Sequence, residues 1–355
     1  MKLLRLANTV NPTSAPYNQF SLGLKDSIDQ TFCSLFRNEI EFDDDITGCN
    51  ANGSVFKMIK LVRKLISKNK YDLIHIHSGL TGLIFFIALI PIRISLINKT
   101  VFTLHNSWNV LKFRNQLLNF FVMLLAKKIC TCGQSSLDSI PWAIKLCIGH
   151  KTIAVVNGFD NYRVDRVERD SNKDHYFENS GLKIVCVGAL NPTKNQIALL
   201  KALESYSIDG EIIFLGDGTK KQALIDFADT LNNPCKITFK GRVSRDIAIE
   251  HMLQADISIS LSRGEGLPIA VLESMYAGCF LILSNIPPHK EIAPPSGRCI
   301  YVDNSNIDNI IEALDYVGKY VEQIREERHI SKRYSIKNFS VNKMLAEYRK
   351  VYDYI

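Results

Sequence analysis

Apolar and polar positions alternate along this chain in two ways, one typical of buried strands and one typical of amphipathic helices. Apolar runs of four to six residues predict strands that are fully buried in parallel sheets. Between residues 55 and 68, apolar side chains recur three or four positions apart, which predicts a helix with one buried face. Predicted strands and predicted helices alternate along most of the chain. The pattern predicts an α/β fold with helices on both faces of each parallel sheet.

The alternation is interrupted once, and this interruption predicts two domains. In the first domain we expect strands at residues 2–7, 73–77, 100–104, 129–132 and 153–156. In the second we expect strands at residues 183–187, 211–215, 236–239, 257–261 and 280–283. The domains are therefore predicted at residues 1–160 and 181–335, with the polar stretch 161–180 as their linker. A helix within residues 336–355 is expected to pack back on the first domain.

The charge of the chain is unevenly distributed and favours an anionic partner for the first domain. Residues 1–160 hold 18 Lys/Arg and 10 Asp/Glu, a formal charge of +8, whereas the remainder holds 25 and 26. A basic surface attracts membrane phosphate or nucleic acid. No helix-turn-helix or RNA-binding motif is present, so we expect an anionic membrane surface and no nucleic acid.

Cysteine usage and hydropathy indicate where the protein works. The nine cysteines include no C-x-x-C pair, as expected for reduced thiols in a cytosolic protein. The first ten residues lack the apolar region of a secretion signal. The most apolar stretch, residues 83–92, is about half the roughly 20 residues that a bilayer requires, and predicts a buried or interfacial helix. We expect a cytoplasmic protein, peripheral at the inner face of the cytoplasmic membrane.

The chemically most informative stretch is residues 262–278, where a predicted strand, a glycine-containing loop and a predicted helix follow one another. Free backbone amides at a helix start bind phosphate, and carboxylates accept hydrogen bonds from sugar hydroxyls. Glu265 and Glu273 lie eight positions apart in this stretch. From the residues alone, two surface glutamates beside an ordinary turn remain an alternative interpretation.

The sequences S-R-x-E-G-L-P and L-E-S-M-x-A-G in this stretch resemble the E-x7-E signature of glycosyltransferase family 4. The resemblance implies the GT-B fold, in which two Rossmann-like domains have parallel sheets that face an interdomain cleft. It also implies retaining transfer of a sugar from a nucleotide diphosphate sugar to a glycan acceptor. Glu273 would bind the ribose and Glu265 would lie by the donor sugar. Backbone amides of the loop would approach the donor at Gly266, Leu267 and Pro268.

Further matches extend the resemblance over most of the chain. Lys194 matches the family lysine that holds the donor diphosphate, whereas Ala189 stands where the family usually has arginine. His105 matches a histidine by the donor sugar, so we take His105 and Glu265 as the catalytic candidates. Three further donor-binding candidates, by the nucleotide base and the phosphates, are Arg242, Val243 and Arg263.

The acceptor is expected mainly on the first domain. The candidates there are Tyr17 and Asn18, in a loop that lacks the glycine pair common in the family, and His77. The resemblance and the basic first half suggest a lipid-linked intermediate of surface polysaccharide or lipopolysaccharide, including O-antigen. The sugar, base and linkage stay open.

We expect no metal and no other cofactor. The D-x-D pattern within Asp43, Asp44 and Asp45 lies in a polar turn, which indicates a solvated loop. Two alternatives to the transferase remain: a nucleotide-sugar epimerase of the same shape, and a non-catalytic nucleotide-sugar-binding partner protein.

Overall fold

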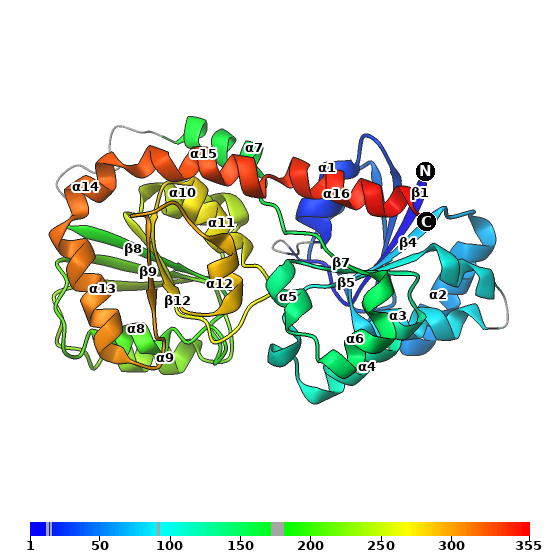
Figure 1. Cartoon of the computed structure of the whole chain (residues 1–355), viewed down its shortest axis with the longest axis horizontal. Helices are drawn as coiled ribbons and strands as arrows, with labels where there is room; N and C mark the ends of the chain where they lie inside the picture. The colour runs from blue at the N-terminus through cyan, green and yellow to red at the C-terminus, as the bar shows by residue number, and fades with distance from the viewer. Residues whose placement is uncertain (12–13, 15, 91–92, 172–180) are drawn as a thin grey trace. The chain divides into compact units, whose positions relative to one another are not determined.

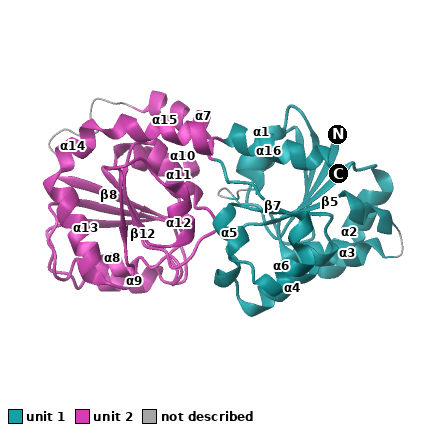
Figure 2. Ribbon diagram, in the orientation of Figure 1, with its two compact units in different colours: residues 1–158, 341–355 teal, residues 159–340 magenta. Residues whose placement is uncertain are grey.

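The computed structural model describes residues 1–11, 14, 16–90, 93–171 and 181–355, which form two compact units (Figure 2). Unit 1 comprises Met1–Gly158 and Val341–Ile355, and unit 2 comprises Phe159–Ser340. Both units are α/β structures with an all-parallel sheet, so the predicted fold class is confirmed. We describe each unit by itself.

Unit 1 contains a seven-stranded sheet in the order β3-β2-β1-β4-β5-β6-β7. The order reverses between β1 and β4, which pair directly. The strands of this sheet are β1 (Lys2–Ala7), β2 (Asp29–Ser34), β3 (Ile46–Asn50), β4 (Leu73–Ile76), β5 (Thr100–Leu104), β6 (Lys128–Thr131) and β7 (Thr152–Ala154).

One face of this sheet is covered by a layer of helices whose apolar sides are buried (Figure 1). In α2, Met58, Val62 and Ile66 recur at intervals of four and are fully buried, and Ser54 caps the helix by accepting from the Lys57 N–H. The helices and helical turns between the strands are α2 (Val55–Lys68), α3 (Gly79–Leu89), η2 (Ile94–Lys99), η3 (Trp108–Val110), α4 (Phe113–Leu125), α5 (Gln134–Asp138), α6 (Trp142–Ile148) and η4 (Gly149–Lys151).

The other face of the sheet is covered by the C-terminal helix α16 (Val341–Asp353), together with η1 (Pro16–Ser21) and α1 (Leu22–Leu24). Side chains of a strand alternate between faces, so Leu3 meets this layer whereas Leu4 meets the α2–α4 layer. Six α16 side chains are buried in the core on this face: Val341, Met344, Leu345, Tyr348, Val351 and Tyr352.

Unit 2 contains a six-stranded sheet in the order β10-β9-β8-β11-β12-β13, which reverses between β8 and β11. Its strands are β8 (Leu182–Val187), β9 (Gly210–Leu215), β10 (Lys236–Gly241), β11 (Ile257–Ser260), β12 (Phe280–Ser284) and β13 (Cys299–Val302). Its helices are α7 (Asn161–Asp170), α8 (Ile197–Ala202), α9 (Lys221–Ala228), α10 (Arg245–Gln254), α11 (Ile269–Tyr276), α12 (Pro287–Ile292), α13 (Ile307–Lys319), α14 (Val321–Glu326) and α15 (Arg328–Phe339).

The predicted linker 161–180 is wrong over its first half, where the chain forms α7 within unit 2. Asp160 caps this helix by accepting from the Arg163 N–H at 3.1 Å. Val164 and Val167 are buried, and Arg163 pairs with Asp246 at 2.9 Å. Tertiary contacts thus stabilise a helix whose polar composition suggested a linker; residues 172–180 lie outside the described residues.

The apolar stretch 83–92 is mostly an internal helix. Eight of the eleven α3 residues are buried, and Ile87 is 49% exposed. Residues 91 and 92 of the stretch lie outside the described residues. Among the helices in the described ranges, none combines the length and apolar character needed to cross a membrane.

Candidate functional sites at the sheet switch points

In unit 2, most of the predicted donor residues follow β8 and β11, the two strands between which the strand order reverses. Ligands of open parallel sheets bind beside the strand ends at such a point. Lys194 comes from the segment after β8, and a Cβ atom at Gly188 would lie 3.4 Å from its side chain. A Cβ atom would thus be only in ordinary contact with the lysine, and glycine is favoured here by its backbone conformation, with φ +149°.

The structure brings Lys194 and Glu265 together. The Lys194 Nζ lies 2.5 Å from Glu265 Oε1, and the Ser262 hydroxyl donates to the same oxygen at 2.6 Å. Glu265 is buried, whereas the lysine side chain is 26% exposed. The ammonium is thus held at the accessible edge of a buried carboxylate, where an anion can approach it.

Glu273 lies within α11, eight positions after Glu265. It pairs with Arg245 at the start of α10. Arg245 reaches Glu273 Oε1 with Nη2 at 2.5 Å and with Nε at 2.7 Å. Burial raises the pKa of Glu273, and the Arg245 guanidinium opposes this shift. Within the described residues, Glu273 Oε2 makes no hydrogen bond, so this oxygen is available to accept from a hydroxyl.

The remaining predicted donor residues of this loop differ in how far they are buried. Gly266, Leu267 and Pro268 are buried in the loop that leads into α11. Arg263 is exposed, and its Nη2 donates to Asn195 Oδ1 at 3.2 Å.

Two further predicted donor residues, Arg242 and Val243, follow β10. Arg242 is exposed and Val243 is half-buried. Arg242 lies near Asp217 in the loop after β9, and the pKa of that carboxyl is lowered by the Gly218 N–H, by Lys221 and by Arg242.

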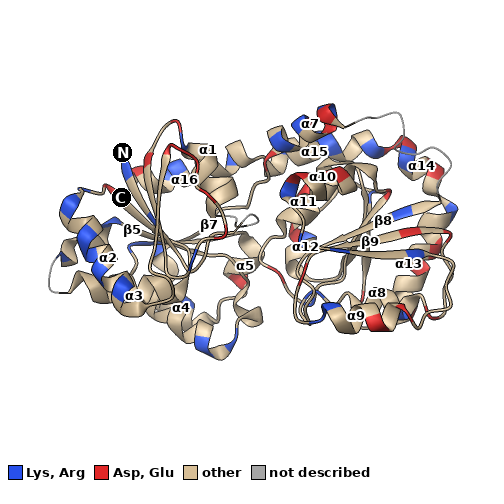
Figure 3. Ribbon diagram, turned by 180° about the vertical axis from the view of Figure 1, so that it is seen from behind, with Lys and Arg blue, Asp and Glu red and all other residues tan. Residues whose placement is uncertain are grey.

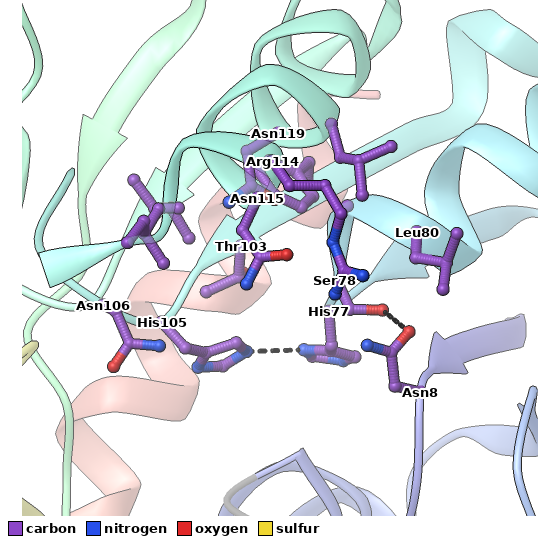
Figure 4. Close-up of a pocket in the computed structure, with 15 residues that line it drawn as sticks. Asn8, His77, Ser78, Leu80, Thr103, His105, Asn106, Arg114, Asn115 and Asn119 are labelled. Atoms are coloured by element: carbon purple, nitrogen blue, oxygen red, sulfur yellow. Dashed lines mark hydrogen bonds between the residues drawn. The ribbon is translucent and has the colours of Figure 1, made fainter.

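In unit 1, a pocket of about 200 Å³ lies at the ends of β1, β4 and β5 (Figure 4). Both predicted histidines line it, and His77 Nδ1 lies 3.0 Å from His105 Nε2. Burial lowers the pKa of His105 to about 4 and that of His77 well below its usual value, so both rings are neutral at pH 7. The other polar side chains around the pocket are Asn8, Ser78, Thr103, Asn106, Arg114, Asn115 and Asn119.

Tyr17 and Asn18, the other predicted acceptor residues, do not line this pocket in the described structure. Both are buried. The Tyr17 hydroxyl accepts from the Asp43 N–H at 2.9 Å, and its ring packs edge-on against Phe42. Asn18 Nδ2 donates to the Ser14 carbonyl oxygen at 3.0 Å. These contacts hold the loops after β1 and β2 together.

Asp43, in the D-x-D pattern, accepts from Lys25 at 2.9 Å, and this contact lowers the pKa of the Asp43 carboxyl. In the described part of the chain, no three His, Cys, Asp or Glu side chains are arranged to hold a metal ion. Metal independence itself stays a prediction.

Two site residues were not predicted from the sequence. Arg245 is recognisable only by its contact with a carboxylate 28 positions away. Arg5, which contacts both His75 and His77, could have been noticed in the sequence, because it is a charged residue inside the apolar strand Lys2–Ala7.

Comparison with known proteins finds similarity to glycosyltransferases. Residues 168–335 match the family of glycosyl transferases group 1. The chain is 26% identical over 310 residues to the capsular polysaccharide biosynthesis glycosyltransferase CapH of Staphylococcus aureus, covering 84% of this chain and 80% of CapH. It is 27% identical over 270 residues to the Escherichia coli UDP-Gal:alpha-D-GlcNAc-diphosphoundecaprenol alpha-1,3-galactosyltransferase, covering 71% and 67% of the two chains.

A solved structure shares the fold over the full length. Anabaena HepE in complex with UDP-glucose superposes with a TM-score of 0.77 at 14% identity, covering 100% of both chains. The E-x7-E stretch lies inside the matched family segment, and two switch-point sites are in place. Residues 168–335 thus carry a group 1 glycosyltransferase domain, the chain is a glycosyltransferase, and its relatives support an assignment to the family 4 type.

Proposed function

We propose that this enzyme is a retaining glycosyltransferase that moves a sugar from a nucleotide diphosphate sugar to a lipid-linked glycan. The observation that carries the proposal is the switch-point arrangement of unit 2, where Lys194 meets Glu265 and a free oxygen of Glu273 lies nearby on the same family motif. A cation for a diphosphate and a carboxylate for ribose hydroxyls are the two groups that a nucleotide sugar requires.

In the proposed reaction, the bond between the anomeric carbon and the diphosphate oxygen breaks, and the acceptor hydroxyl oxygen bonds to that carbon from the same side. The hydroxyl proton passes to the departing phosphate oxygen. Lys194 stabilises the negative charge that develops on the diphosphate. No metal ion is required in this proposal, because the ammonium takes the role of the counter-charge.

We assign the acceptor to unit 1. Its pocket is lined by amide, hydroxyl and imidazole groups and by the Arg114 guanidinium, all of which can hydrogen-bond sugar hydroxyls. The names of two relatives support the acceptor class, since one acts in capsular polysaccharide biosynthesis and the other on a diphosphoundecaprenol-linked sugar. A capsule-type or O-antigen intermediate on a polyprenyl diphosphate is therefore the proposed acceptor.

A surface of unit 1 supports binding to the membrane that would carry such a lipid. On α4, Phe113, Leu117 and Phe121 recur every fourth residue and are 79%, 46% and 45% exposed. The neighbouring α6 exposes Trp142 and Leu146 at 76% and 75%. Contiguous exposed apolar side chains of this kind mark an interaction surface.

The same helical layer carries positive charge. On α2, which packs against α3, four lysines are exposed and no acidic residue occurs (Figure 3): Lys57, Lys60, Lys64 and Lys68. Lysines attract an anionic bilayer, and aromatic side chains such as Trp142 insert at its interface. We therefore propose peripheral attachment through the α2–α6 layer, with the enzyme in the cytoplasm.

Donor turnover with and without an acceptor tests the proposed activity. The protein is incubated with UDP- and GDP-sugars, alone and with polyprenyl-diphosphate-linked sugars, and the anomeric configuration of the product is read by NMR. We expect transfer with retention that depends on the acceptor. Epimerised donor without acceptor would indicate the epimerase, and binding without turnover would indicate a partner protein.

Vesicle co-sedimentation tests the membrane proposal. We expect binding to phosphatidylglycerol vesicles at low salt and loss at 1 M salt, where charges are screened beyond about 3 Å. Trp142→Ser should weaken binding, whereas Ile247→Ser, at an exposed apolar position of unit 2, should not. Equal and negligible binding at both salt concentrations would contradict the proposal.

A further inference from the structure

Arg5 is a fully buried cation in the middle of the unit 1 sheet. It lies on the face that α16 covers, beside His75 on the paired strand β4. Its Nε donates to Gln30 Oε1 at 2.9 Å, and no carboxylate pairs with it among the described residues. Because burying a charge without a counter-ion is costly, the neutral neighbours must turn acceptor atoms towards it.

Two of these neighbours are histidines, and both contact one nitrogen of the guanidinium. Arg5 Nη1 lies 3.1 Å from His75 Nδ1 and 3.4 Å from His77 Nε2. A guanidinium nitrogen carries two protons and has no acceptor capacity. Each ring therefore presents an unprotonated nitrogen to Arg5.

This constraint propagates from His77 to the pocket. With Nε2 of His77 unprotonated, the single proton of its neutral ring is on Nδ1, 3.0 Å from His105 Nε2. His77 is then the donor and His105 Nε2 the acceptor. The proton of neutral His105 must be on Nδ1, which makes no hydrogen bond with any described residue. Figure 4 shows the two rings with this hydrogen bond at the edge of the pocket.

We propose that Arg5 is a positioning residue that fixes His105 as the Nδ1–H tautomer, so that the pocket offers a neutral hydrogen-bond donor to a sugar or phosphate oxygen. The identity of the bound group rests on the proposed function, whereas the tautomer does not. The opposite tautomer would present a lone pair at this position, which repels a phosphate oxygen and can only accept from a sugar hydroxyl instead of donating to it.

The hydrogen bonds of His75 follow from the same constraint, because its Nδ1 also faces Arg5. His75 Nδ1 accepts from Arg5, so His75 Nε2 donates to Thr103 Oγ1 at 2.7 Å. The Thr103 hydroxyl oxygen lies 3.1 Å from the Tyr348 hydroxyl oxygen, and either hydroxyl can be the donor. Tyr352 also lies 2.8 Å from His75 Nδ1. Tyr352 contacts Arg5 and His75, and within the described residues no hydrogen bond joins it to His77 or His105. Tyr352→Phe therefore keeps the contacts that orient His105 and serves as a control.

Nitrogen-15 NMR of the histidine-labelled protein tests the proposal directly, because protonated and unprotonated ring nitrogens give distinct shifts. His105→Gln identifies the signals of His105. In the wild type we expect a protonated Nδ1 and an unprotonated Nε2 for His105. A protonated Nε2, or a doubly protonated ring at pH 7, would overturn the proposal without any variant of Arg5.

Substitution of Arg5 tests its role. In Arg5→Met we expect His105 to become a mixture of both tautomers, in Arg5→Lys we expect the wild-type tautomer to persist, and in Tyr352→Phe no change. Affinity for the sugar should fall about 2- to 12-fold in Arg5→Met, as for the loss of one neutral hydrogen bond. An unchanged His105 tautomer in a folded Arg5→Met protein would overturn the proposal.

The two proposals fail separately. If no nucleotide sugar is turned over but His105 carries its proton on Nδ1, the proposed function is wrong and the tautomer control stands. If transfer occurs but His105 carries its proton on Nε2, the tautomer control is wrong.

Discussion

Removal of the Glu273 carboxylate is expected to abolish recognition of the nucleotide ribose. One oxygen of this carboxylate is held by Arg245, whereas the other makes no hydrogen bond with described residues. In Glu273→Ala the hydroxyl partner is lost. Since a hydrogen bond to a charged group contributes about 1.5–3 kcal/mol, nucleotide affinity should fall about 10- to 150-fold.

The same substitution leaves a buried cation behind. The Arg245 side chain is 9% exposed, and removal of one partner of a buried ion pair costs about 3–5 kcal/mol of folding stability. Affinity loss could then arise from partial unfolding. Adding Arg245→Met removes the orphaned charge, so the double variant should regain stability while staying defective in ribose binding.

Calorimetry with a pair of nucleotides isolates the ribose contact. The nucleoside diphosphate that binds best is compared with its 2′,3′-dideoxy form in wild type and variants. The wild type should prefer the ribose form by about 10- to 150-fold. Glu273→Ala should bind both forms equally, and Glu265→Gln, which alters the other carboxylate, should keep the preference. Equal binding of both nucleotides by the wild type would refute the reasoning.

Three further predictions concern the donor site and its surroundings. EDTA should leave transfer intact, and activity that is lost with EDTA and restored by manganese or magnesium would contradict metal independence. The side chain of Ala189 is exposed, so this position should tolerate arginine. Ala189→Arg should tighten binding of the nucleoside diphosphate, because a guanidinium can donate to two phosphate oxygens. Weaker binding by a folded variant would mean that the diphosphate is held differently. Burial lowers the pKa of His289 to about 4, so the unfolded state, near 6.5, takes up the proton first as the pH falls. Folding stability should therefore drop by about 2 kcal/mol between pH 7 and 5; His289→Asn should lack this contribution in urea unfolding, and equal pH dependence would contradict it.

The sequence predicted the central strands because their burial is visible as uninterrupted apolar runs. β4, β5 and β12 are buried at every position. The outer strands β2 and β3 were missed, since their sequences DQTFCS and ITGCN contain few apolar residues and only neighbouring strands specify them. α7 was missed for a related reason, because its stability depends on contacts with distant residues such as Asp246.

The strand ends that carry the candidate site residues could be predicted, but not the charged partners of these residues. Lys194, Glu265 and His105 all follow strands, and the ends of parallel strands form one edge of a sheet. Their partners depend on the tertiary fold. Glu273 meets an arginine 28 positions before it, and Arg5 meets histidines 70 and 72 positions after it.

The two switch points differ in whether the cation has an oppositely charged partner, and this difference suits different ligands. In unit 2, Lys194 is paired with Glu265 at 2.5 Å and remains partly exposed. A diphosphate can become a second partner of this ammonium, because the carboxylate already compensates for its desolvation. The donor site is thus charged but balanced before the ligand arrives.

In unit 1, by contrast, Arg5 has only neutral partners and lies away from solvent. Its charge cannot meet the ligand, because His77 and His105 lie between it and the pocket. What Arg5 passes on to the pocket is a direction of hydrogen bonding, from donor to acceptor, and not its charge; the guanidinium that lines the pocket is that of Arg114. A neutral sugar hydroxyl has no charge to match and is recognised by the direction of its hydrogen bonds, so this arrangement suits the glycan side of the reaction, whereas ion pairs suit the diphosphate side.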